Sequence, residues 1–164
     1  AYVLTAALAA PALERMGVDQ LAAHLFVFYF AIIACVTPPV SICAYAGAGI
    51  ADADPVETGF AAAKLAIAGF IVPYMFVYNP ALVTRGTLVD IFFSSVTALI
   101  GVVVLAGGLQ GWLLRKTGKT EKWLVIAAGI ALVVPQLWVT LFGFTLAAGI
   151  IGRQWVSLRA AESV

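Results

Sequence analysis

The sequence predicts an all-α integral membrane protein that crosses the bilayer several times. Of its 164 residues, 63% are hydrophobic and only 10% are charged, and the mean hydropathy is +1.07. A soluble domain carries about 25% charged residues, so this chain has too few polar side chains to cover a surface in water. Because a helix needs about 20 apolar residues to span a bilayer, the length leaves room for roughly four to six spans.

The apolar stretch Ala1–Leu13 predicts a first helix that is too short to span. The polar residues of 14–20 end it. The chain begins with alanine, and this stretch has neither the basic start nor the cleavage site of a signal peptide. We therefore expect the chain to begin inside a larger protein.

The run Leu21–Ile50 contains no formal charge and is interrupted by Thr37, Pro38 and Pro39. Two consecutive prolines remove two backbone donors and clash with the preceding turn, so a continuous helix is not expected. The pattern predicts two half-helices, about 21–36 and 40–50, which together form one broken transmembrane span.

The next helix has a clear start signal. Asp54 supplies an N-cap carboxylate, Pro55 occupies the first helical position, and Glu57 occupies the third, as in a capping box. The helix is predicted to continue to about Tyr78, where the Asn-Pro pair at 79–80 ends it.

Two further apolar runs follow. The run Leu88–Leu114 is long enough to span. The run Trp123–Gly152 is longer than one crossing and carries Pro135 near its middle, so it is either one kinked helix or a hairpin of two shorter helices. The tail Arg153–Val164 is polar and is expected to lie in water.

Charge predicts the orientation. If the broken span and the next two helices cross in sequence, loops 51–54 and 115–122 share one face, whereas Arg15 and Arg85 share the other. The loop at 115–122 holds four positive charges against one in each opposing loop. The positive-inside rule therefore places loop 115–122 in the cytoplasm.

Several functional classes find no support in the residues. With 9 Lys+Arg against 8 Asp+Glu and no long basic stretch, no nucleic-acid partner is expected. There is no Gly-rich phosphate loop, metal-binding His pair or nucleophile elbow, so no enzyme and no cofactor are expected.

The histidine and the two cysteines are also poor candidates for chemistry. His24 has no acid or thiol at helical spacing and is expected to make a helix contact. Cys35 and Cys43 cannot form a zinc set, so we expect buried free thiols and no transition metal.

The two intramembrane charges have structural explanations. Lys64 can extend its ammonium group to the headgroups, and Asp90 is an acid in the first turn of its helix. The small residues at 44–49 favour close helix packing.

The break at Thr37, Pro38 and Pro39 is the feature with a physical argument for function. Unwound backbone at membrane depth is tolerated only where protein buries it or where it lines an aqueous site, and such breaks coordinate sodium or protons in transporters. The Thr37 hydroxyl and the carbonyls of Ala34 and Val40 are candidate ligands. The alternative is a proline kink in a structural helix.

The succession of residues resembles the large membrane subunit of TRAP (tripartite ATP-independent periplasmic) transporters, in particular the fused permeases. The resemblance rests on the segments 8–13, 17–18, 22–30, 36–40, 48–51, 54–55 and 69–80. It divides the chain into a transporter core at 1–82, a C-terminal extension of membrane helices at 83–152, and the polar tail at 153–164.

The resemblance implies a sodium-driven symporter of the bacterial or archaeal inner membrane. Its substrate, an organic anion such as a carboxylate, would arrive on a periplasmic binding protein, and the chain would work with the rest of the permease, including a small membrane subunit or its fused equivalent. The family has two inverted halves and an elevator motion. This chain would be the second half, with Ala1–Leu13 as the returning arm of a re-entrant hairpin.

The resemblance also implies a sodium site at Ala34, Thr37 and Val40, with Na⁺ as the coupling ion. Ser41 stands where the family often has glycine, and its hydroxyl could add an oxygen. The rival interpretation is a non-transporting structural or assembly subunit of a membrane complex.

Overall fold

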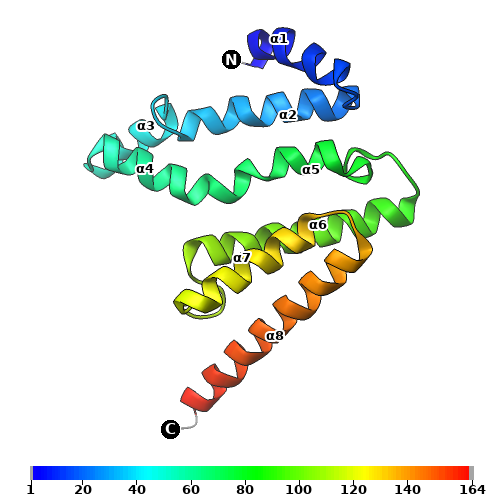
Figure 1. Ribbon diagram of the computed structural model, residues 1–164. Helices are drawn as coiled ribbons and strands as arrows, with labels where there is room; N and C mark the ends of the chain where they lie inside the picture. The colour runs from blue at the N-terminus through cyan, green and yellow to red at the C-terminus, as the bar shows by residue number, and fades with distance from the viewer. Residues whose placement is uncertain (1, 163–164) are drawn as a thin grey trace. The chain divides into compact units, whose positions relative to one another are not determined.

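The computed structural model describes the backbone of residues 2–162 and the side chains of residues 2–159. The chain forms two compact units, Ala1–Arg85 and Gly86–Val164, which are described in turn. In the described residues all regular structure is helical, apart from one isolated β-bridge between Trp112 and Lys116 (Figure 1).

Within the described residues, three segments are long and apolar enough to cross a membrane, namely Pro55–Tyr78, Leu88–Gln110 and Leu137–Arg159. Together with the absence of strands among the described residues, they confirm the predicted fold class, an all-α polytopic membrane protein.

The first unit opens with α1 (Tyr2–Arg15), which packs against α2 (Gln20–Ile33). Small buried side chains, including Ala10 and Ala23, allow the two helices to approach closely. Helix α1 extends two residues beyond its predicted end and stops before Gly17, whose φ of +90° favours glycine.

After α2 the chain forms a 3₁₀ turn, η1 (Ala34–Val36), and a non-helical turn at 37–41 before α3 (Ile42–Ala51). Helix α4 (Pro55–Ala66) begins as predicted, because the Asp54 carboxylate accepts a hydrogen bond of 2.8 Å from the Glu57 amide. Helices α3 and α4 pack against each other.

The segment predicted as one helix to Tyr78 is divided. Helix α4 passes into a 3₁₀ turn, η2 (Ile67–Phe70), before α5 (Val72–Tyr78). Pro73 explains the difference, because it has no amide to donate to the carbonyl four residues earlier and its ring crowds that carbonyl. The predicted end is confirmed: Asn79 follows α5, and its side chain caps the short 3₁₀ turn η3 (Pro80–Val83).

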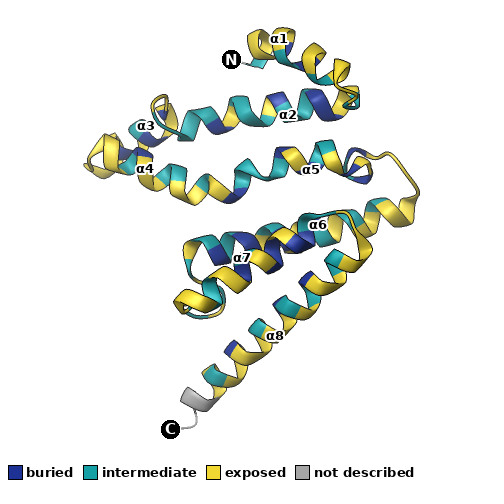
Figure 2. Cartoon of the chain, in the orientation of Figure 1, coloured by how far each residue is buried: buried dark blue, intermediate teal, exposed yellow. Residues whose placement is uncertain are grey.

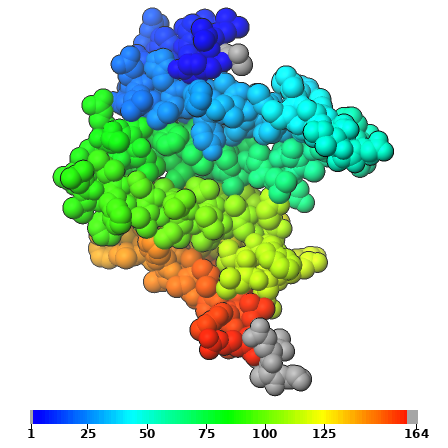
Figure 3. Space-filling model, turned by 180° about the vertical axis from the view of Figure 1, so that it is seen from behind, coloured from blue at the N-terminus to red at the C-terminus, as the bar shows by residue number. Residues whose placement is uncertain are grey.

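Aromatic rings join α5 to α2. Tyr74 stands edge-on to Phe26, with 5.2 Å between ring centroids, and it also contacts Phe30. In the space-filling view, side chains close the space between α2 and the α4–α5 segment (Figure 3).

The second unit begins with α6 (Leu88–Gln110), which starts at a capping box formed by Thr87 and Asp90. This confirms Asp90 as a first-turn acid. The helix ends four residues before the predicted Leu114, because Gly111 adopts φ +74° and terminates it.

Two helices complete this unit, α7 (Lys119–Val133) and α8 (Leu137–Glu162). Of the two alternatives for the last apolar run, the hairpin is therefore correct. Its arms are unequal, however, since α8 is itself long enough to span and continues through most of the segment predicted as a polar tail. Helix α7 starts four residues before Trp123 because its first turn is capped by Glu121.

Close helix contacts build the core of the second unit (Figure 2). A Cβ added at Gly129 of α7 would lie 2.7 Å from the Leu105 backbone of α6, so only glycine fits there. The buried residues around this contact are Val104, Val125, Ala128, Leu132 and Ala147.

A polar clip formed by Gln154, Glu121 and the Leu114 amide ties α8 to the α6–α7 loop. Gln154 is 0% exposed; its amide nitrogen donates to Glu121 at 3.0 Å and its oxygen accepts from the Leu114 amide at 3.1 Å. Glu121 also accepts from the Gly118 amide and lies 3.8 Å from Arg115. The hydrogen bond from Gln154 is the main cause that lowers the pKa of Glu121.

This clip predicts a pH dependence of stability. A carboxyl whose pKa is lowered by folding stabilises the protein above its unfolded pKa and loses that contribution as the pH falls through the folded value. We expect Glu121 to make its full contribution to the stability of the protein above about pH 4.5, the ordinary pKa of glutamate, and to lose that contribution as the pH falls further. The measurement is thermal unfolding of the detergent-solubilised chain at a series of pH values.

The variant Glu121→Gln should reduce this acid sensitivity, whereas Glu57→Gln, at an exposed carboxylate, should retain it. Equal acid sensitivity in wild type and Glu121→Gln would contradict the assignment.

Candidate functional site

The turn at 37–41 joins η1 to α3 and contains the two consecutive prolines. Because Pro38 and Pro39 have no amide hydrogen, only three of its five residues can donate a backbone hydrogen bond. The amide of Thr37 donates to the Ala34 carbonyl at 3.4 Å, and that of Ser41 donates to the Thr37 carbonyl at 3.0 Å. The turn is therefore richer in acceptors than in donors.

Thr37 is extended, with φ −115° and ψ 133°, and is half-buried. Its hydroxyl donates to the Ile33 carbonyl at 3.1 Å. That bond uses the only hydroxyl proton, so the lone pairs of the Thr37 oxygen remain available to another group.

The other predicted ligands lie on either side of Thr37. Ala34 is half-buried in η1, and Val40 is exposed. Among the described residues, no backbone or side-chain donor is bonded to the Val40 carbonyl, whereas the Pro39 carbonyl accepts from the Tyr45 hydroxyl at 3.3 Å. The turn thus presents both a hydroxyl oxygen and carbonyl oxygens, the two kinds of ligand that were predicted.

Ser41 is the most constrained residue of the turn. It is 0% exposed and its φ of 38° lies in the left-handed region, which is uncommon for a residue with a side chain. Its hydroxyl oxygen has no hydrogen-bond partner among the described residues. A buried polar atom without a partner costs free energy, so this hydroxyl calls for a functional explanation.

Gly59 of α4 lies against this turn. A Cβ added there would meet the Tyr45 ring at 3.2 Å, the Ser41 hydroxyl at 3.3 Å and the Pro38 ring at 3.5 Å. The contact between α3 and α4 therefore depends on the absence of a side chain at Gly59. Sequence reasoning identified the small residues of α3 as a packing surface but did not identify Gly59.

His24 makes the expected helix contact, with partners that sequence spacing could not reveal. Its Nδ1 lies 2.9 Å from the Tyr2 hydroxyl, and its Nε2 lies 3.8 Å from the Glu14 carboxylate. Both partners come from α1. No acid lies at helical spacing on α2 itself, so the pairing follows only from the packing of the two helices.

The cysteines are free, as expected, but they are not buried. Cys35 is half-buried in η1 and Cys43 is exposed on α3. The expectation of buried thiols was wrong because the residues around the break leave one side of each helix uncovered within this chain. Among the described residues, no group of three or more His, Cys, Asp or Glu side chains could hold a metal ion.

The architecture defines a class of protein, a polytopic helical membrane protein. Comparison with protein families specifies this class. Residues 1–91 match the DctM component of tripartite ATP-independent periplasmic transporters, and the chain belongs to this family.

The family match includes the whole first unit and ends in the first turn of α6. The chain is therefore a component of a TRAP transporter permease, as the resemblance implied. No curated protein and no solved structure matched the chain.

The packing at Gly59 generates a prediction about stability. Replacing Gly59 with leucine should push the Tyr45 ring and the turn at 37–41 out of place, because overpacking of this kind costs about 1–3 kcal/mol. The measurement is thermal unfolding of the chain in detergent.

Gly49→Leu is the matched control, since nothing lies within 4 Å of a Cβ built at Gly49. If both variants unfold at the same temperature, the close approach of α3 and α4 does not limit the stability of the turn.

Proposed function

We propose that this chain is part of a sodium-coupled symporter that imports an organic anion, such as a carboxylate, from a periplasmic binding protein. Membership of the DctM family supports the transporter role. The observation that carries the sodium coupling is the surplus of oxygen acceptors in the turn at 37–41.

The proposed ligands are the carbonyl or hydroxyl oxygens of Ala34, Thr37 and Val40. Sodium is a hard cation that neutral oxygens can bind, and broken transmembrane helices supply such oxygens from unwound backbone. Pro38 and Pro39 contribute by keeping the turn out of the helix and by removing competing donors. The unpartnered hydroxyl of Ser41 is a further candidate ligand.

The proposal includes a location and partners. We place the chain in the inner membrane, with loop 115–122 in the cytoplasm by the positive-inside rule. The partners would be the periplasmic binding protein and the rest of the permease, including the small membrane subunit or its fused equivalent.

The Thr37 hydroxyl offers the sharpest test. In the permease that contains this chain, reconstituted with its binding protein, Thr37→Val removes the hydroxyl at nearly constant shape, whereas Thr37→Ser keeps it. We expect Thr37→Val and Thr37→Ala to raise the sodium concentration for half-maximal uptake about tenfold, which corresponds to about 1.4 kcal/mol. Thr37→Ser should stay near wild type.

Sodium dependence that is unchanged in Thr37→Val and Thr37→Ala would make the prolines a structural kink only. Uptake that needs no sodium in the wild type would refute the coupling itself. If the chain is instead a structural subunit without a transport function, no uptake is expected with or without sodium.

A further inference from the structure

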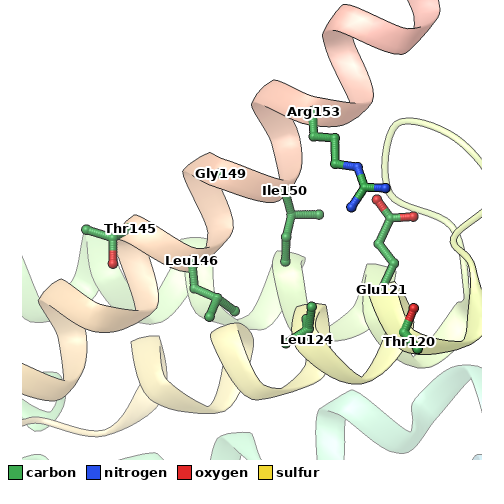
Figure 4. Close-up of a pocket in the computed structure, with 8 residues that line it drawn as sticks. All are labelled: Thr120, Glu121, Leu124, Thr145, Leu146, Gly149, Ile150 and Arg153. Atoms are coloured by element: carbon green, nitrogen blue, oxygen red, sulfur yellow. The ribbon is translucent and has the colours of Figure 1, made fainter.

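The second unit contains a groove between α7 and α8 that the proposed transport site does not use. Its volume is about 280 Å³, and it is lined by Thr120, Glu121, Leu124, Thr145, Leu146, Gly149, Ile150 and Arg153. The two charged members, Glu121 and Arg153, gather with Thr120 at one end, while Leu124, Leu146, Ile150 and the neutral Thr145 line the remainder (Figure 4). The groove is therefore amphipathic along its length.

The polar end of the groove lies in the most basic part of the chain. Five of the nine Lys and Arg residues belong to this part: Arg115, Lys116, Lys119, Lys122 and Arg153. The polar clip at Gln154 holds α8 beside the α6–α7 loop and the start of α7. Residues that are far apart in the sequence are thus joined into one cationic cluster.

Glu121 is the one carboxylate in the groove, and the protein already uses its charge. It accepts hydrogen bonds from Gln154 at 3.0 Å and from the Gly118 amide at 3.3 Å, and Arg115 lies 3.8 Å away. Arg153 faces this carboxylate, and its positive charge helps to lower the pKa of Glu121, but among the described side chains Arg153 forms no ion pair within 4.0 Å. Its exposed guanidinium at the mouth of the groove can receive an anion.

We propose that this groove binds an anionic glycerophospholipid, with the phosphodiester on Arg153 and an acyl chain along Leu124, Leu146 and Ile150. Charge complementarity selects an anionic headgroup, because basic pockets between membrane helices on the cytoplasmic side bind such lipids. The apolar lining selects a lipid over a free phosphate. Gly149 keeps the groove open, since nothing lies within 4 Å of a Cβ built there.

The test measures lipid preference by tryptophan quenching. The purified full chain, which has four tryptophans, is placed in vesicles that contain dibrominated phosphatidylglycerol or dibrominated phosphatidylcholine with the same acyl chains. The ratio of the two quenching affinities is the readout, so a change in folding that affects both lipids cancels. We expect a preference for phosphatidylglycerol in the wild type.

Two pairs of variants distinguish lipid binding in the groove from non-specific attraction of anionic lipids to basic residues. Arg153→Gln should lower the preference roughly fivefold, the factor that corresponds to about 1 kcal/mol per basic residue near the membrane surface. Arg159→Gln should leave it unchanged, because Arg159 stacks on the Trp155 ring, 3.8 Å from its centroid, and does not line the groove. Gly149→Leu should fill the groove and abolish the preference, whereas Gly152→Leu should not.

Three results would overturn the proposal. The first is an equal affinity of the wild type for the two lipids. The second is an equal loss of the phosphatidylglycerol preference in Arg153→Gln and Arg159→Gln, which would mean that the basic surface attracts anionic lipids without a specific site. The third is displacement of the lipid by soluble glycerol phosphate, which would identify a phosphate site without an acyl chain.

Discussion

The need to satisfy every backbone polar group without water governs this chain. In a bilayer an unpaired amide or carbonyl costs several kcal/mol, so helices dominate and each interruption needs its own solution. The turn at 37–41 reduces the demand by using two prolines, which carry no amide. Of its three remaining amides, those of Thr37 and Ser41 bond within the turn region. The turn keeps more acceptors than donors, and a cation is a natural partner for the acceptors that remain.

The α6–α7 loop satisfies its backbone with a buried side chain instead. There an amide, that of Leu114, needs an acceptor, and the buried Gln154 supplies it from 40 residues away. The other end of the same side chain donates to Glu121. One neutral side chain thus satisfies a donor and an acceptor at once, and Arg115 lies 3.8 Å from the same carboxylate.

Local signals in the sequence were sufficient for much of the fold. The carboxylate at Asp54 and the pair at 79–80 marked helix ends that the structure confirms, because caps and prolines act within a few residues. The 3₁₀ turn at η2 could have been expected from Pro73, since the effect of proline on the carbonyl four residues earlier is local too. The end of α6 was predicted too late because Gly111 is followed by more apolar residues, and hydropathy outweighed the glycine signal.

Features that depend on contacts between helices could not be read from the sequence. The pairing of His24 with Tyr2 and Glu14, the clip at Gln154 and the buried hydroxyl of Ser41 all require knowledge of which helix faces meet. For the candidate site, the sequence indicated the break and its oxygen atoms. It could not indicate that Gly59 closes over them or that Ser41 is left without a partner.

The absence of charge from the run 21–50 constrains how the proposed site would work. A sodium ion held only by neutral oxygens keeps its full positive charge in a medium of low dielectric constant, where an uncompensated charge is costly. An anion bound nearby would reduce that cost, and by linkage the cation would reduce the cost of the anion by the same amount. At the proposed site, the lack of a carboxylate ligand would thus make the affinity for sodium depend on the substrate. On this argument, an organic anion and a sodium ion would favour each other's binding because the protein provides a counter-charge for neither within this span.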